Sequence, residues 1–173
     1  MASYLLDTNI IRSWYDGNAT VKANADARDA DSPLHISVIT RGEIEYGHAL
    51  NPHGAGPKRT DYIEFVKKRL PWVLVVSKHT AEPYGHIRAM LINKFPPSGG
   101  WSKQGKKRAE QLYDPAAARE LGIDENDLWI VAQAVERNLV LVTSDKMPRI
   151  REAVCEIYPH FRLEDWTKEE RST

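Results

Sequence analysis

Short apolar runs alternate along this chain with stripes of hydrophobic residues spaced three or four positions apart. A short apolar run is typical of a strand, and a stripe with that spacing is typical of a helix that buries one face. The pattern predicts strands over Tyr4–Leu6, Leu34–Ile39, Val73–Val76 and Leu139–Val142, and the strand over Val73–Val76 is of the buried type. It predicts a helix that begins near Ile10 and a loose helix within Asp16–Ser32. Further helices are predicted over about Thr40–Leu50, Ile63–Leu70, Tyr84–Phe95 and Asn126–Asn138.

This alternation predicts an α/β sandwich around a mostly parallel sheet, because each crossover between parallel strands needs a helix. In such sheets, ligands gather outside the carboxyl ends of the strands. The residues directly after each predicted strand are therefore the first candidates for a functional site.

Composition narrows the class of protein without identifying its chemistry. The chain has 173 residues, 42% of them hydrophobic, so we expect a single domain over residues 1–173 with a substantial core. The chain has one cysteine, shows no secretory signal and has no apolar run long enough to cross a bilayer. We therefore expect a cytoplasmic protein without membrane contact. The formal net charge is zero, so a nucleic acid would have to bind at local basic patches.

The segment at about 95–122 departs from the regular pattern and is interpreted as an insertion. It opens with Pro-Pro and Gly-Gly pairs, which favour turns. A basic run follows, which is either a phosphate-binding flap for RNA or a solvated surface loop. The residues concerned, beside Trp101, are Lys103, Lys106, Lys107 and Arg108.

Four acidic residues lie at or near the ends of predicted strands. Asp7 follows the first strand directly, where capping the next helix is the alternative interpretation. Asp145 follows the last strand, where an ordinary turn residue is the alternative. Glu43 lies one turn into the helix after the second strand, and Asp127 opens the helix after the insertion.

The two helical acids also have a purely structural alternative. Thr40 and Glu43 have the spacing of a capping box, in which the glutamate satisfies backbone N–H groups. Asp124 has the position of a helix cap, and Asp127 would then only complement the helix dipole.

Taken together, the four acids indicate a metal site. Strand ends meet at one edge of a parallel sheet, where uncompensated carboxylates repel and raise one another's pKa. A hard divalent cation such as Mg²⁺ or Mn²⁺ relieves that repulsion and prefers oxygen ligands. Such a site can hydrolyse phosphodiesters. The chain has no Cys/His set with zinc spacing and no phosphate-binding loop motif, so other metal and nucleotide chemistries are not indicated.

Four motifs, in order and at similar spacing, resemble those of the PIN-domain ribonucleases, and in particular VapC-like toxins. The resemblance covers nearly the whole chain, and it depends on the four motifs together because each alone is weak. The motifs are Leu5-Leu6-Asp7-Thr8-Asn9; Ser37-Val38-Ile39-Thr40-Arg41-Gly42-Glu43 with Gly47; Asn126-Asp127 with Ile130, Ala132 and Ala134; and Leu141-Val142-Thr143-Ser144-Asp145.

The resemblance implies a PIN-like α/β/α sandwich and a Mg²⁺- or Mn²⁺-dependent endoribonuclease that cleaves RNA. It also implies a homodimer that a VapB-like antitoxin holds inactive. Carried across motif by motif, the catalytic and metal-binding acids would be Asp7, Glu43, Asp127 and Asp145, with Thr8, Asn9, Thr143 and Ser144 as supporting polar groups.

Several details stay open at this level. Asn9 either orients a carboxylate or water, or is an ordinary local cap. Arg41 either contacts an RNA phosphate or is an exposed helix residue. Val131 stands where an alanine is common in the family. The insertion is longer than in compact members, and this greater length puts the choice of RNA in doubt.

Two rival functions are kept. A haloacid dehalogenase-like phosphatase also places an aspartate after its first strand, but it needs a second aspartate where this chain has Asn9. The other rival is a catalytically silent RNA- or protein-binding module on a PIN scaffold, since fold alone does not establish activity.

Overall fold

The structure is a computed structural model that describes residues 2–28, 32–50, 57–95, 110, 112–114 and 119–168. Its contacts divide the chain into two compact units. The first combines residues 1–75, 138–146 and 162–173, and the second combines residues 76–137 and 147–161. The expectation of one domain over the whole chain stays a prediction.

The first unit is built on a five-stranded sheet in the order β3-β2-β1-β6-β7, in which every neighbouring pair is parallel. In register, Leu6 lies level with Ile36 on one side and Val142 on the other. The predicted α/β class with a mostly parallel sheet is therefore confirmed. The strands are β1 Tyr4–Leu6, β2 Leu34–Ser37, β3 Val73–Leu74, β6 Val140–Val142 and β7 Arg162–Glu164.

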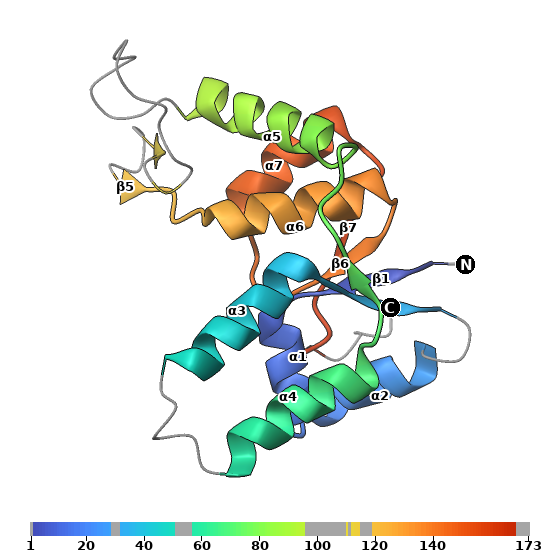
Figure 1. The fold of residues 1–173 in the computed structure, drawn as a ribbon. Helices are drawn as coiled ribbons and strands as arrows, with labels where there is room; N and C mark the ends of the chain where they lie inside the picture. Colours follow the sequence, from blue (N-terminus) through green and yellow to red (C-terminus); the bar gives the residue numbers. More distant parts are fainter. Residues whose placement is uncertain are drawn as a thin grey trace. The chain divides into compact units, whose positions relative to one another are not determined.

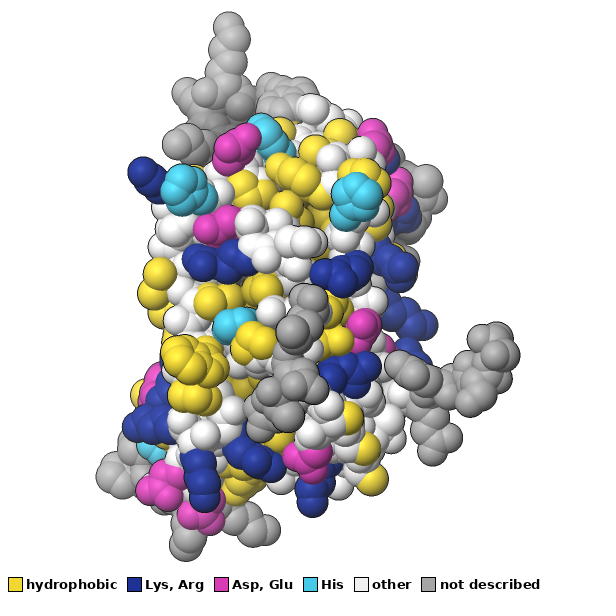
Figure 2. Space-filling model, turned by 90° about the vertical axis from the view of Figure 1, so that its right-hand side faces the viewer, with side chains coloured by type: hydrophobic (Ala, Val, Ile, Leu, Met, Phe, Trp, Pro, Cys, Tyr) yellow, Lys and Arg dark blue, Asp and Glu magenta, His cyan; other side chains and the backbone are white. Residues whose placement is uncertain are grey.

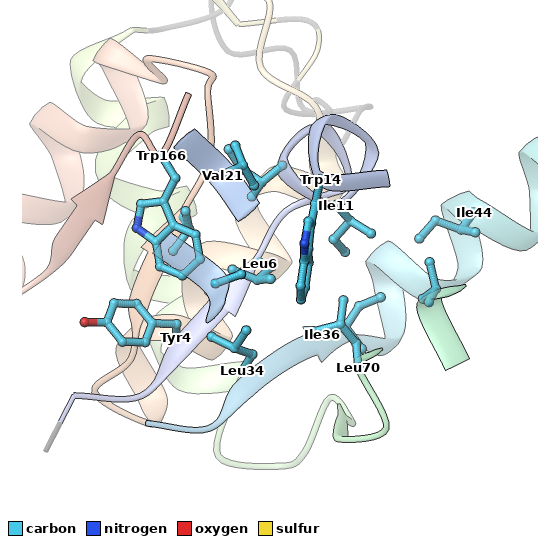
Figure 3. Close-up of a cluster of buried hydrophobic side chains, with 14 of the residues drawn as sticks. Tyr4, Leu6, Ile11, Trp14, Val21, Leu34, Ile36, Ile44, Leu70 and Trp166 are labelled. Carbon is cyan, nitrogen blue, oxygen red and sulfur yellow. The ribbon is translucent and has the colours of Figure 1, made fainter. Parts of the chain in front are cut away.

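Helices α1 (Thr8–Tyr15), α2 (Ala19–Arg28), α3 (Val38–Ala49) and α4 (Pro57–Arg69) complete this unit (Figure 1). Its central strand is apolar throughout, as expected where both faces of a sheet are covered. Leu5 and Leu6 are fully buried. Around Leu6, side chains from strands and helices form one hydrophobic cluster (Figure 3), whose labelled members are Tyr4, Leu6, Ile11, Trp14, Val21, Leu34, Ile36, Ile44, Leu70 and Trp166.

The second unit contains helices α5 (Ala81–Lys94), α6 (Glu125–Glu136) and α7 (Pro148–Ile157), and α5 packs against both of the others. The predicted stripe on α5 is confirmed at Ile87 and Leu91, which are fully buried. Two short strands, β4 (Tyr113–Asp114) and β5 (Arg119–Glu120), pair antiparallel within the expected insertion. Its basic run lies outside the described residues. No helix in the described ranges has the length and apolarity needed to span a bilayer.

Two predictions of secondary structure need correction, and two further elements were missed. The strand predicted to reach Ile39 ends at Ser37, because the Ser37 hydroxyl accepts a hydrogen bond from the Ile39 N–H (3.0 Å) and caps a helix that begins at Val38. The strand predicted over residues 73–76 has only two residues and is not buried, because β3 is an edge strand. Helix α7 and strand β7 were not predicted.

The position of the α3 cap excludes the alternative capping box of Thr40 and Glu43. Thr40 lies inside the helix, and its hydroxyl is buried with no hydrogen-bond partner in the described structure. Ser37→Ala is therefore expected to lower the free energy of unfolding by about 1 kcal/mol. Thr40→Val, which removes an unsatisfied buried hydroxyl, should cost nothing or stabilise the protein. Denaturant unfolding of both variants checks the pair, and a larger loss for Thr40→Val would contradict it.

Candidate acidic site at the strand ends

Asp7 stands at the junction of β1 and α1, at the carboxyl edge of the sheet. Its backbone N–H continues the strand pairing by donating to the Val142 carbonyl (3.0 Å), and its extended backbone makes it the cap of α1. The side chain is only 6% exposed. A cap is thus part of its role, but the other contacts of its carboxylate go beyond capping.

Both oxygens of the Asp7 carboxylate accept hydrogen bonds. The Thr8 backbone N–H donates to Oδ1 (2.7 Å). The Asn9 amide (3.0 Å) and the Thr143 hydroxyl (2.8 Å) both donate to Oδ2. All three donors are neutral, so within the described residues these hydrogen bonds fix the orientation of the carboxylate without cancelling its charge.

Glu43 joins this network through Thr8. The Thr8 hydroxyl donates to Glu43 Oε2 at 2.6 Å, while the backbone N–H of the same residue holds Asp7. Thr8 therefore connects an acid at the end of β1 with an acid on α3, which lies 35 positions from Thr8 in the sequence.

The turn after β6 is tied to the same network by Asn9 and Thr143. Besides holding Asp7, the side-chain amide N–H of Asn9 donates to the Thr143 hydroxyl (2.9 Å), and the side-chain Oδ1 of Asn9 accepts the backbone N–H of Ser144 (3.0 Å). The N–H of Asp145 donates to the Thr143 hydroxyl (3.1 Å). These bonds link the ends of β1 and β6, so Asn9 does more than cap its own helix locally.

The negative charges of two other carboxylates act on Asp7. Burial is the largest cause of the raised pKa of Asp7, and the negative charges of Glu43 and Asp145 raise this pKa further. The hydrogen bonds from Thr143 and Thr8 lower it in part. Asp7 is therefore a buried carboxylate whose charge is disfavoured by its surroundings in the absence of a cation.

Of the four predicted acids, Asp7, Glu43 and Asp145 lie in the first unit and share this network. Asp127 belongs to the second unit, in the first turn of α6. The cap of that helix is Asp124, whose carboxylate accepts the Asn126 N–H at 2.8 Å. The alternative role of Asp124 as the cap of the helix is therefore confirmed, and Asp127 lies three positions further along, in the first turn.

Of the predicted RNA contacts, the structure describes Arg41 alone. Arg41 forms an ion pair with Glu45 one turn further along α3. Two positions along a helix correspond to a rotation of about 200°, so Arg41 and Glu43 point to different flanks of α3. Lys103, Lys106, Lys107 and Arg108 lie outside the described residues.

The donor set fits a hard divalent cation by its chemistry, since carboxylate oxygens are what Mg²⁺ and Mn²⁺ prefer. The raised pKa of Asp7 also fits, because a cation would favour its charged form. However, the described residues contain no group of three or more acidic, histidine or cysteine side chains already arranged to hold a metal.

The pKa of Asp7 gives a testable pH dependence. Because the folded pKa is raised above 3.8, the folded state binds more protons than the unfolded state in the window between the two values. In chelator, the stabilisation from protonated Asp7 should be lost as pH rises through this window, and Asp7→Asn should show a flatter profile. Denaturant unfolding between about pH 4 and pH 7 measures the two slopes.

The slope, not the absolute stability, is the useful measurement here. An asparagine at position 7 turns an N–H group toward either the Thr8 N–H or the Asn9 amide, so the variant should also lose a hydrogen bond. Asp61→Asn, an exposed change on α4, serves as the control. Equal slopes for wild type and Asp7→Asn would contradict the assignment of this pKa.

No protein-family model and no curated protein matches the chain, whereas solved structures do. VapBC2 from Rickettsia felis, bound to a promoter DNA fragment, has 22% identity and a TM-score of 0.63 over 94% of this chain and 98% of that chain. VapBC-1 from nontypeable Haemophilus influenzae has 24% identity and a TM-score of 0.62 over 95% and 98%. VapBC-5 from Mycobacterium tuberculosis, from a family of toxin–antitoxin systems, has 19% identity and a TM-score of 0.52 over 95% and 98%. These similarities confirm the predicted PIN-like α/β/α fold.

Proposed function

We propose that this protein is a metal-dependent endoribonuclease and the toxin of a toxin–antitoxin pair. The observation that carries the proposal is the buried Asp7 carboxylate, which is held by three neutral donors and lies in the field of Glu43 and Asp145. A fold needs no such concentration of negative charge for stability, whereas a divalent cation site does.

The ligands of Mg²⁺ or Mn²⁺ in this proposal are Asp7, Glu43, Asp127 and Asp145, with Asp127 included on its motif alone. The bound cation supplies a more acidic water and offsets the charge that develops on the phosphodiester. The chain's own polar groups orient the ligands, since Thr143 and Asn9 fix Asp7 and Thr8 fixes Glu43. Such outer hydrogen bonds keep ligand side chains oriented for binding.

The proposal includes a protein partner. The similar structures are VapBC complexes, which supports a small VapB-like antitoxin for this chain. A partner that inhibits by covering the site would present a basic group, and an arginine pairs best with carboxylates because its fork donates two parallel hydrogen bonds. Expression of this chain should then arrest growth, and if a small open reading frame adjoins its gene, co-expression of that frame should relieve the arrest. The protein is also proposed to form a homodimer.

The phosphatase alternative is not proposed. That chemistry needs a carboxyl group at position 9, and the Asn9 amide is committed to Asp7, Thr143 and the Ser144 N–H. No observation favours a catalytically silent module either, although the test below separates it from the nuclease.

The test is cleavage of labelled single-stranded RNA by the purified protein with Mg²⁺, with Mn²⁺ and with chelator. We expect endonucleolytic products only with a divalent metal ion, and sequencing of RNA 5′ ends after brief induction should locate the cuts in cells. RNA binding without metal-dependent cleavage would indicate the silent module. Hydrolysis of small phosphate esters in place of RNA would indicate the phosphatase.

A further inference from the structure

Lys146 is an exposed cation directly after Asp145, in the turn that follows β6. Within the described part of the chain, no hydrogen bond or ion pair involves its side chain. Arg41, by contrast, is engaged by Glu45. Lys146 is therefore a free positive charge next in sequence to a proposed metal-binding acid.

The backbone on both sides of Lys146 is held in place. On one side, the N–H of Ser144 is bound by Asn9 and the N–H of Asp145 by Thr143. On the other side, Met147 is 6% exposed and has a left-handed backbone (φ 39°), which is costly for a residue other than glycine and indicates a constrained turn. The lysine thus extends from a short anchored segment.

The positive charge of Lys146 would offset the repulsion between the acidic site and the RNA backbone. The site concentrates the carboxylates of Asp7, Glu43 and Asp145, while the RNA backbone brings a negative charge with every phosphate. The chain as a whole offers no attraction, because its net charge is zero. On the face shown in Figure 2, basic and acidic side chains are interspersed. Attraction of RNA to the site must therefore come from local groups.

We propose that Lys146 binds a backbone phosphate of the RNA substrate beside the acidic site. This inference rests on the proposed nuclease function and adds to it a substrate-binding residue, set by the turn that Asn9 and Thr143 anchor. Lysine acts on phosphate chiefly as a point charge, so arginine at position 146 should replace it and alanine should not.

The experiment measures binding of a fluorescent single-stranded RNA to the full chain in chelator, which prevents metal-dependent cleavage, across a range of salt concentrations. One lost phosphate contact should lower the slope of log affinity against log salt by about 0.7. At 0.1 M salt this corresponds to roughly fivefold weaker binding for Lys146→Ala. Lys146→Arg should bind like the wild type. The matched control is Lys67→Ala, which removes another exposed lysine, on α4.

Cleavage with metal provides a second measurement. For Lys146→Ala we expect a higher KM with a nearly unchanged kcat, because a phosphate contact beside the site holds the RNA without taking part in the chemistry. If wild type binds and cleaves RNA but Lys146→Ala has the same salt slope and KM, the inference is wrong. Equal losses in Lys146→Ala and Lys67→Ala would also overturn it, since they would indicate a diffuse charge effect. Failure of the wild type to bind or cleave RNA would instead overturn the proposed function.

Discussion

Asp145→Asn is expected to lower metal-dependent RNA cleavage by about two to four orders of magnitude, because a lost metal ligand removes several kcal/mol of transition-state stabilisation. Asp145 is a cleaner target than Asp7. Its side chain is exposed, and its bond to Thr143 comes from the backbone N–H, which the substitution retains. The fold should therefore survive, as an unchanged unfolding midpoint in chelator would verify.

Two comparisons make this expectation specific. Asp61→Asn removes an exposed carboxylate from α4 and should cleave RNA at the wild-type rate. Addition of Mg²⁺ or Mn²⁺ should raise the unfolding midpoint of the wild type more than that of Asp145→Asn, because a ligand that binds only the folded state stabilises it by an amount that grows with the logarithm of its affinity. Wild-type cleavage by purified Asp145→Asn would remove this residue from the site.

Asp127→Asn is expected to produce a loss of cleavage of similar size, about two orders of magnitude or more, with little change in stability. The reason lies in the division of roles within the first turn of α6. Asp124 caps the helix by accepting the Asn126 N–H, whereas Asp127 follows it in the first turn, where an acidic side chain complements the helix dipole. An asparagine at position 127 removes the charge that complements the helix dipole but keeps the size of the side chain and an oxygen that accepts hydrogen bonds, so only a modest change in stability is expected.

The neighbouring cap supplies the matched control for this prediction. Asp124→Ala should lower the free energy of unfolding by about 1 kcal/mol and leave cleavage intact at temperatures where the protein is folded. Kinetic assays and denaturant unfolding of the two variants separate the roles. If Asp127→Asn loses stability and keeps activity, Asp127 has only the structural role that its position in the first turn also allows.

The order of the elements could be predicted because it depends on local patterns. Val140–Val142 and Tyr4–Leu6 are short apolar runs in the sequence, and both are strands in the structure. The beginning of α3 is also local, yet it was predicted too late. The pattern places Val38 and Ile39 in the strand, whereas the Ser37 hydroxyl caps a helix that begins at Val38. The serine before the apolar stretch was the available signal for that boundary.

Strand β3 shows where a local pattern does not suffice. The apolar run after Leu70 predicts a buried strand, but the structure pairs β3 only with β2 and leaves Val73 41% exposed. The position of a strand within a sheet depends on contacts with distant segments, so an apolar run by itself cannot distinguish an edge strand from a central one.

The sequence alone determined which acids follow strands and that parallel strands would bring several strand ends to one edge. Only the tertiary structure decided how these residues are connected. The Thr143 hydroxyl reaches Asp7 across 136 positions, and Asn9 holds the turn that leads to Lys146. The sequence predicted that neighbouring carboxylates raise the pKa of Asp7, but the largest cause of this raised pKa, the burial of the side chain, is a property of the folded structure alone. Residue type and spacing are set along the chain, whereas burial and hydrogen-bond partners arise when distant segments fold together.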